Sequence, residues 1–130
     1  MRNATCELNI KREEVTAHLE RILAGRRFAL AERNGRFLRY VVEATLDGKS
    51  GEIKETVIAT EVYGRRADYD PKADSIVRVE ATRLRQKLHS YYQSEGQGDA
   101  IRIHIPCGTY VPRFELIPPE ASDLSSGIAA

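Results

Sequence analysis

The segment DSIVRVEATRLRQKLHSYY, residues 74 to 92, decides the fold and carries most of the positive charge excess of the chain. Residues 75 to 92 hold four basic side chains and one acidic one, whereas residues 1 to 74 hold fourteen and thirteen, and residues 93 to 130 hold two and five. The formal net charge of +1 therefore conceals a basic segment that an acidic C-terminal part compensates. The question is whether this segment is a solvated helix surface or a surface that binds phosphate.

The segment predicts one long amphipathic helix that begins at Asp74 or Ser75, either of which can cap it, and ends near Tyr92 or Gln93. At about 100° per residue, one stripe is apolar and is predicted to be buried, namely Val77, Ala81, Leu84 and Leu88, extended by Tyr91 and Tyr92. A second stripe, predicted to be exposed, contains Arg78, Thr82, Arg85 and His89, with Arg83 and Lys87 farther round. Val79 and Ile76 lie outside the apolar stripe, which is unusual for a fully solvated surface.

Three further helices are predicted ahead of this one. Apolar residues at helical spacing indicate helices over residues 11–24, 29–48 and 52–64. The inward set of the second comprises Leu30, Leu38, Val41, Val42 and Leu46, and Gly64 closes the third. A polar loop, residues 65–73, then leads into the basic helix, and its Asp70-Pro71 pair excludes helix at Asp70.

A β-hairpin is predicted after the basic helix. In residues 100–106 three isoleucines alternate with polar residues, which is typical of a half-buried strand. Cys107-Gly108-Thr109 predicts the turn, and residues 109–117 predict the returning strand, which Pro112 limits to an edge or irregular position. Several helices followed by a hairpin indicate the α+β fold class.

Length and composition fit one globular domain. The chain has 130 residues, of which 42% are hydrophobic and 30% charged, and the folded part is predicted to span residues 10–117, with disordered segments at 1–9 and 118–130. No apolar run reaches the length of a membrane span and the N-terminus lacks the apolar region of a secretory signal, so the predicted location is cytoplasmic. Cys6 and Cys107 are interpreted as free thiols.

The residue types that carry catalysis do not assemble into a recognisable motif. His104 and Cys107 are three apart beside a strand and have no second ligand pair, which disfavours a metal site. Gly96-Gln97-Gly98 follows a helix and is interpreted as a turn, and His18 as a solvated helix residue. A Cys107 nucleophile with His89 as base has nothing to orient it. We therefore expect a protein that is not an enzyme and that uses no cofactor or metal.

The motifs VRVEATRLRQKL and IHIPCGTYVPRF together resemble the recognition helix and C-terminal hairpin of response-regulator DNA-binding domains of the OmpR/PhoB type. The helix pattern of that family is V-x-V-x-x-x-x-L-R-x-K-L, and the residues that match it are Val77, Val79, Leu84, Arg85, Lys87 and Leu88. Gly108 and Tyr110 approach the Gly-x-Gly-Tyr hairpin motif, and EVYGRRADYD is similar to the family's aromatic-Gly segment. The resemblance covers about residues 29 to 114. It implies a winged helix-turn-helix, in which three helices, the last one long and basic, precede a hairpin wing.

The resemblance implies that the protein binds double-stranded DNA and regulates transcription or signalling in a bacterium. The basic helix would enter the major groove, with Arg78, Thr82 and Arg85 toward the bases and Arg83, Lys87, Arg102, Thr109 and Arg113 toward phosphates or the adjacent groove. It further implies a monomer in solution that loads as a tandem pair on DNA, and a contact of the 65–73 loop with RNA polymerase. The family's receiver domain is absent from the 130 residues.

Two departures from the family pattern weaken the expected wing contact. Thr109 leads directly to Tyr110 where the second glycine of the motif would stand, and Cys107 occupies a position that is usually basic. The alternative hypothesis is a winged-helix module that binds protein through the same basic helix. The two hypotheses differ in salt dependence, because only binding to duplex DNA should weaken steeply as salt rises.

Overall fold

The computed structural model describes residues 11–117 and contains five α-helices, a short 3-10 helix and a two-stranded antiparallel sheet. In chain order, the elements are α2 (Arg12–Leu23), α3 (Arg26–Ala29), α4 (Glu32–Leu46), η1 (Ser50–Glu52), α5 (Glu55–Glu61), α6 (Ile76–Gln93), β1 (Ile101–His104) and β2 (Arg113–Leu116). The predicted α+β class is confirmed. The segments predicted to be disordered, 1–9 and 118–130, lie outside the described residues, as does Cys6.

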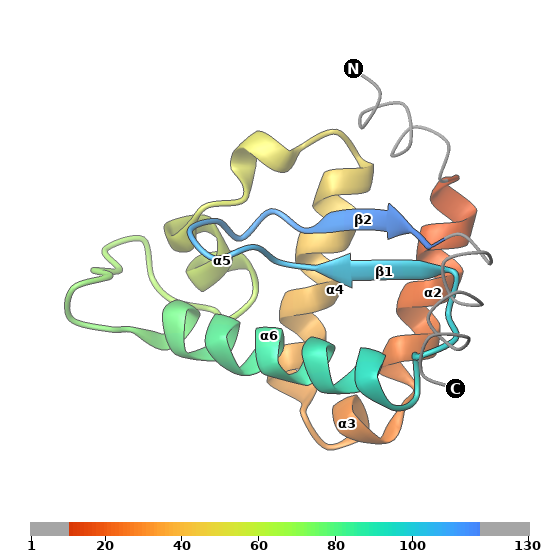
Figure 1. The fold of residues 1–130 in the computed structure, drawn as a ribbon. Helices are drawn as coiled ribbons and strands as arrows, with labels where there is room; N and C mark the ends of the chain where they lie inside the picture. The colour runs from red at the N-terminus through yellow and green to blue at the C-terminus, as the bar shows by residue number, and fades with distance from the viewer. Residues whose placement is uncertain (1–10, 118–130) are drawn as a thin grey trace.

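The core lies where α4, α6 and the hairpin meet. In Figure 1, α6 and the hairpin run across the molecule with α4 behind them, and α2 packs against α4. The largest fully buried side chains of this core include Phe37 and Leu38 from α4, Leu84 and Leu88 from α6, and Ile103 from β1. The isoleucines of β1 therefore point inward, as their alternation predicts.

The first predicted helix is confirmed as α2, but the start of the second was placed too early. Leu30 belongs to the turn between α3 and α4 and is 97% exposed, so its assignment to the buried set was wrong. The four-residue helix α3 turns Phe28 into the core, and the chain then reverses at Leu30 before α4 begins at Glu32. A helix of one turn has too few residues to show a periodic pattern.

The third predicted helix is shorter than expected, because residues 50–52 form the separate 3-10 helix η1 and α5 begins only at Glu55. The helix ends at Glu61, three residues before the predicted close at Gly64. Gly64 has the left-handed φ of +65° that favours glycine after a helix end, and the Arg65 N–H that follows it donates back to the Ala59 carbonyl of α5 at 2.9 Å.

The basic helix α6 and the hairpin have the predicted limits to within a few residues. Asp74 Oδ1 accepts a hydrogen bond from the Ile76 N–H at 3.1 Å and so satisfies a free donor at the start of α6. In the hairpin, Ile103 pairs with Phe114 and His104 with Arg113, and β2 begins directly after Pro112. Gly108 has φ +91° in the predicted turn. The two strands are only four residues long, so the connection between them is an extended eight-residue loop.

Candidate nucleic-acid interface

Four of the exposed side chains of α6 lie on the side opposite the core, and we call them the outward stripe: Val79, Thr82, Arg83 and Gln86. They lie three, four and seven residues apart on a helix of about 27 Å, so they form one line opposite the buried stripe. All four are exposed, and Val79 is 41% exposed although it is apolar. The buried stripe itself is as predicted, with Val77, Ala81, Leu84 and Leu88 in the core.

Sequence reasoning did not name Val79 and Gln86 as surface contacts. The signal that could have found Val79 is its position outside the apolar stripe, since an apolar side chain there has no core to enter. Gln86 is uncharged, so counting charges along the sequence could not identify it as a surface contact.

Arg83 is the cation of the outward stripe. Its side chain is 64% exposed, and its Nη1 lies 3.4 Å from Oε2 of Glu80. Glu80 is itself turned inward: it is 4% exposed, and its Oε1 accepts a hydrogen bond from Asn34 Nδ2 at 2.7 Å. Because Asn34 holds the carboxylate at the helix flank, the guanidinium of Arg83 can leave it for a phosphate or a guanine edge without disturbing α6.

Arg85 does not point into solvent, which corrects its assignment to the exposed stripe. Its Nε donates to the Ile105 carbonyl at 2.9 Å, and its Nη2 donates to the carbonyls of Thr109 at 2.9 Å and Pro106 at 3.3 Å. The half-buried side chain therefore fastens the hairpin loop to α6. A contact between Arg85 and a DNA base stays a prediction. In the fold, Arg85 holds the hairpin loop against α6.

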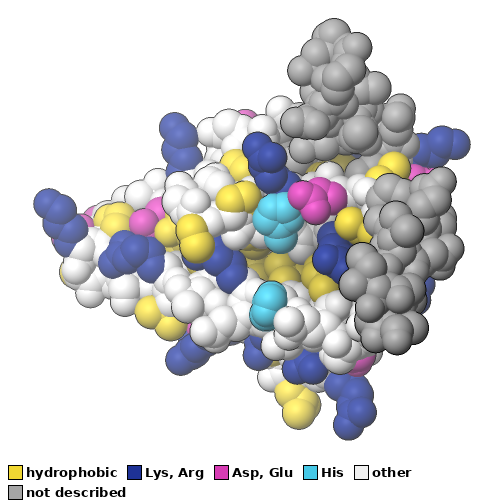
Figure 2. All heavy atoms as spheres, in the orientation of Figure 1, with side chains coloured by type: hydrophobic (Ala, Val, Ile, Leu, Met, Phe, Trp, Pro, Cys, Tyr) yellow, Lys and Arg dark blue, Asp and Glu magenta, His cyan; other side chains and the backbone are white. Residues whose placement is uncertain are grey.

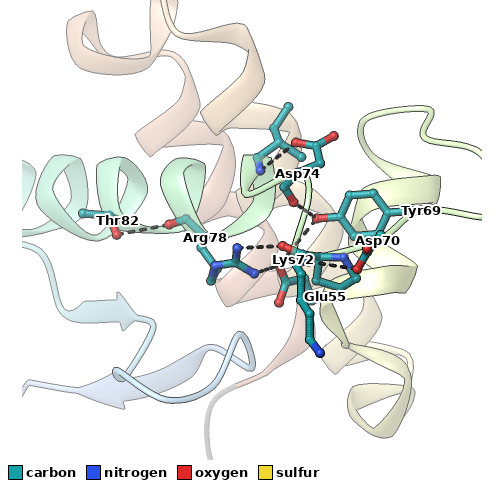
Figure 3. Close-up of polar contacts among 9 residues, drawn as sticks. Glu55, Tyr69, Asp70, Lys72, Asp74, Arg78 and Thr82 are labelled. Carbon is teal, nitrogen blue, oxygen red and sulfur yellow. Dashed lines mark hydrogen bonds and ion pairs between the residues drawn. The ribbon is translucent and has the colours of Figure 1, made fainter.

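Arg78 is also engaged, at the other end of the same flank (Figure 3). One terminal nitrogen binds Glu55 Oε2 at 2.5 Å, and the other donates to the Pro71 carbonyl at 2.7 Å. Through these contacts Arg78 joins α6 to the start of α5 and to the 65–73 loop. Thr82 donates its hydroxyl to the Arg78 carbonyl at 3.1 Å and keeps its methyl group and oxygen at the surface.

The segment between α5 and α6 is held by its own polar contacts. The Tyr69 hydroxyl donates to the Asp74 carbonyl at 2.7 Å, and Arg65 Nε lies 2.8 Å from Asp74 Oδ2. The Arg65 guanidinium lowers the pKa of the Asp74 carboxyl, so Asp74 stays ionised and continues to cap α6. The contact of the 65–73 loop with RNA polymerase stays a prediction.

The remaining predicted contact residues divide between exposed and half-buried positions. Arg113 is exposed on β2, whereas Lys87 and Thr109 are half-buried. Arg102 is half-buried and turned toward α6, with its guanidinium carbon 5.7 Å from the centre of the Tyr92 ring. The turn residue Cys107 is exposed, as predicted. His18, by contrast, was predicted to be solvated and is only 7% exposed.

A groove connects α6 to the hairpin loop. It has a volume of about 500 Å³ and is lined by Ile53, Lys54, Glu55, Arg78, Thr82, Arg85, Gly108, Thr109 and Tyr110. On the side of the molecule formed by α6 and the hairpin, Lys and Arg side chains outnumber Asp and Glu side chains (Figure 2). The described part of the chain thus presents one long helix, an adjacent exposed turn and a basic surface around them.

No family model, curated protein or solved structure matches the chain. The chemistry of the surface therefore has to support any assignment alone. Within residues 11–117, no helix combines the length and apolar character needed to cross a bilayer. In the same range, no group of three His, Cys, Asp or Glu side chains could hold a metal ion.

Proposed function

We propose that the chain binds double-stranded DNA as a winged helix-turn-helix module and regulates transcription or signalling. The observation that carries the proposal is the outward stripe of α6, where Arg83, Thr82 and Gln86 stand exposed beside an apolar Val79. An α-helix fits the major groove, arginine donates to guanine edges, and small apolar groups contact the methyl group of thymine. The order of α4, α5, α6 and hairpin supports the same proposal.

Positive charge at both sides of α6 suits phosphate contacts. Lys54 lies in the groove at the start of α5, and Arg113 is exposed on β2. Such contacts position a protein on the duplex, whereas the outward stripe would read sequence. The connection between α5 and α6, residues 62–75, is longer than the three or four residues of a simple helix-turn-helix. The contacts of Tyr69, Arg78 and Arg65 make this long connection a fixed part of the surface.

The test is a titration of the protein with duplexes recovered by selection from a random pool, at about 50 and 200 mM salt. We expect affinity to fall steeply with salt, and Arg83→Ala to lose about 1 to 3 kcal/mol of binding free energy while the variant stays folded. Arg12→Ala is the matched control, because it removes the same charge from α2, away from the outward stripe.

Binding that Arg83→Ala leaves unchanged would contradict the proposal, as would the recovery of no duplex at low salt. The second outcome would favour the protein-binding module, for which the exposed Val79 at the N-terminal end of the stripe is the supporting observation. Sedimentation with and without a recovered duplex tests the assembly that the family resemblance implies, a free monomer that loads as a tandem pair. A dimer that persists at all concentrations without DNA would contradict that assembly.

A further inference from the structure

The edge of β1 that does not pair with β2 faces α6. The Ile117 N–H donates to the Ala100 carbonyl at 2.7 Å, so the backbone groups at residues 100, 102 and 104 turn toward β2 and those at 101 and 103 turn away. On this free edge the Ile103 N–H donates to the Tyr92 hydroxyl at 2.7 Å, and the Ile105 carbonyl accepts from Arg85. The Ile105 N–H donates to no group of residues 11–117, so the edge retains an open donor.

A second groove lies along this edge. Its volume is about 320 Å³, at the lower end of the range for small-molecule sites. Leu88, Ile103 and Ile105 supply an apolar floor, and the side chains around it include His89, His104 and Arg102. Figure 2 shows the hollow as a hydrophobic floor between histidine side chains.

Arg102 gives this groove its chemical preference. Its Nε is buried and has no hydrogen-bond partner within the part of the chain that the structure describes. Buried donors are almost always paired in folded proteins, so an unpaired one beside a groove indicates that an acceptor is missing. Glu115 stands opposite Arg102 in the strand register and also lines the groove, but it is exposed, and Arg102 forms no ion pair within residues 11–117.

We propose that this groove binds a small carboxylate with an apolar body. The carboxylate would accept hydrogen bonds from Arg102 and from the Ile105 N–H, and the apolar body would lie on Leu88 and Ile103. Charge-assisted hydrogen bonds of this kind are the strong ones, and a histidine on either side can add a further donor. The groove is separate from the outward stripe, so the proposal does not depend on DNA binding.

The probe is octanoate, added to the ¹⁵N-labelled protein, with octylammonium as the matched control of opposite charge, whose apolar chain is one methylene longer. We expect octanoate to shift the amide signals of Ile103 and Ile105 saturably, and octylammonium to bind at least about tenfold more weakly. Equal affinity for the two probes would overturn the proposal, because it would show a groove that accepts any apolar chain. Signals that do not respond to octanoate would overturn it as well.

Arg102→Gln then tests the guanidinium, with Arg113→Gln as the matched control. The Arg113→Gln substitution removes the same charge from the same hairpin, and Arg113 does not line the groove. We expect Arg102→Gln to weaken octanoate binding by about tenfold or more and Arg113→Gln to change it less than twofold. If Arg102→Gln does not fold, His104→Gln replaces it, with a loss of several-fold expected. Octanoate binding as in the parent, in a folded variant of either kind, would overturn the proposal.

Discussion

Two sides of α6, the flank that faces the rest of the molecule and the outward stripe, carry similar residues but differ in what those residues contact. On the flank that faces the rest of the molecule, Arg78, Arg85 and Tyr92 stand seven residues apart and so lie on one line, two turns from each other. Each holds a distant part of the chain: Arg78 the loop before α6, Arg85 the hairpin loop and Tyr92 the edge of β1. On the outward stripe, the hydrogen bonds that Thr82 and Arg83 form within residues 11–117 all go to residues of α6 itself.

The difference shows that the type of side chain does not decide its role. Arg83 and Arg85 are two residues apart, and both supply donors that suit phosphate. Arg85 donates to three backbone carbonyls because the hairpin loop passes beside it. Arg83 is largely exposed to solvent, because no other element of residues 11–117 covers it. A basic helix can therefore present fewer free cations than its sequence suggests.

The largest expected effect is that of Arg85→Ala on stability. The substitution leaves three carbonyl acceptors without their charged donor. Hydrogen bonds to charged groups contribute more to stability than those between neutral groups. We expect the free energy of unfolding in urea to fall by about 2 to 3 kcal/mol. Arg83→Ala, the matched control from the outward stripe, should change it by less than about 0.5 kcal/mol. Equal effects of the two substitutions would remove the distinction between flank and stripe.

A smaller effect is expected for Tyr92→Phe. The Tyr92 hydroxyl accepts from the Ile103 N–H at 2.7 Å and lies 2.8 Å from His18 Nε2, so its removal leaves both groups without a partner. We expect a loss of about 1 to 2 kcal/mol in thermal or urea unfolding. Tyr40→Phe is the control, because the Tyr40 hydroxyl forms no hydrogen bond with residues 11–117. A Tyr92→Phe protein as stable as the Tyr40→Phe protein would show that the flank is not held by this hydroxyl.

The sequence was sufficient for the parts of the fold that depend on local pattern. The buried stripe of α6, the left-handed glycine Gly64 that follows α5 and the hairpin with its exposed turn are all expected from periodicity and turn chemistry, and the structure contains them. These features are fixed by residues close in the chain, which is why one sequence is enough to predict them.

Two of the errors, those on Arg85 and His18, concern contacts between residues far apart in the chain. Arg85 was assigned to solvent because the hairpin loop that binds it lies about twenty residues later. His18 was assigned to solvent although Tyr92, 74 residues away, stacks on its ring. In both cases a polar residue on a helix is satisfied by a partner that no periodicity reveals.

His18 extends the flank contact of Tyr92 to α2. Burial raises the pKa of Tyr92, so its hydroxyl keeps its proton. A hydroxyl has one proton and two lone pairs, so the Tyr92 oxygen can accept from the Ile103 N–H and also donate its proton to His18 Nε2, 2.8 Å away. In that arrangement neutral His18 carries its own proton on Nδ1, 3.7 Å from Asp99 Oδ2. Asp99 also binds the Tyr91 hydroxyl at 2.9 Å and Arg21 at 3.0 Å. A second proton, on Nε2, would require the Tyr92 hydroxyl to turn from donor to acceptor at this contact.

The smallest expected effect is therefore a dependence of stability on pH. Burial lowers the pKa of His18, with a contribution from Arg21 that Asp99 opposes, so the unfolded chain binds a proton more readily than the folded one. The stability from neutral His18 is fully present above the ordinary histidine pKa of about 6.5 and is lost as pH falls below it, through the folded pKa. We expect His18→Gln to lose less stability than the parent between about pH 7.5 and 5.5, measured by urea unfolding at each pH. His89→Gln, at an exposed position of α6, should keep the dependence of the parent. If His18→Gln also keeps it, the acid sensitivity belongs to other groups, and the hydrogen bond to Tyr92 does not depend on a neutral His18.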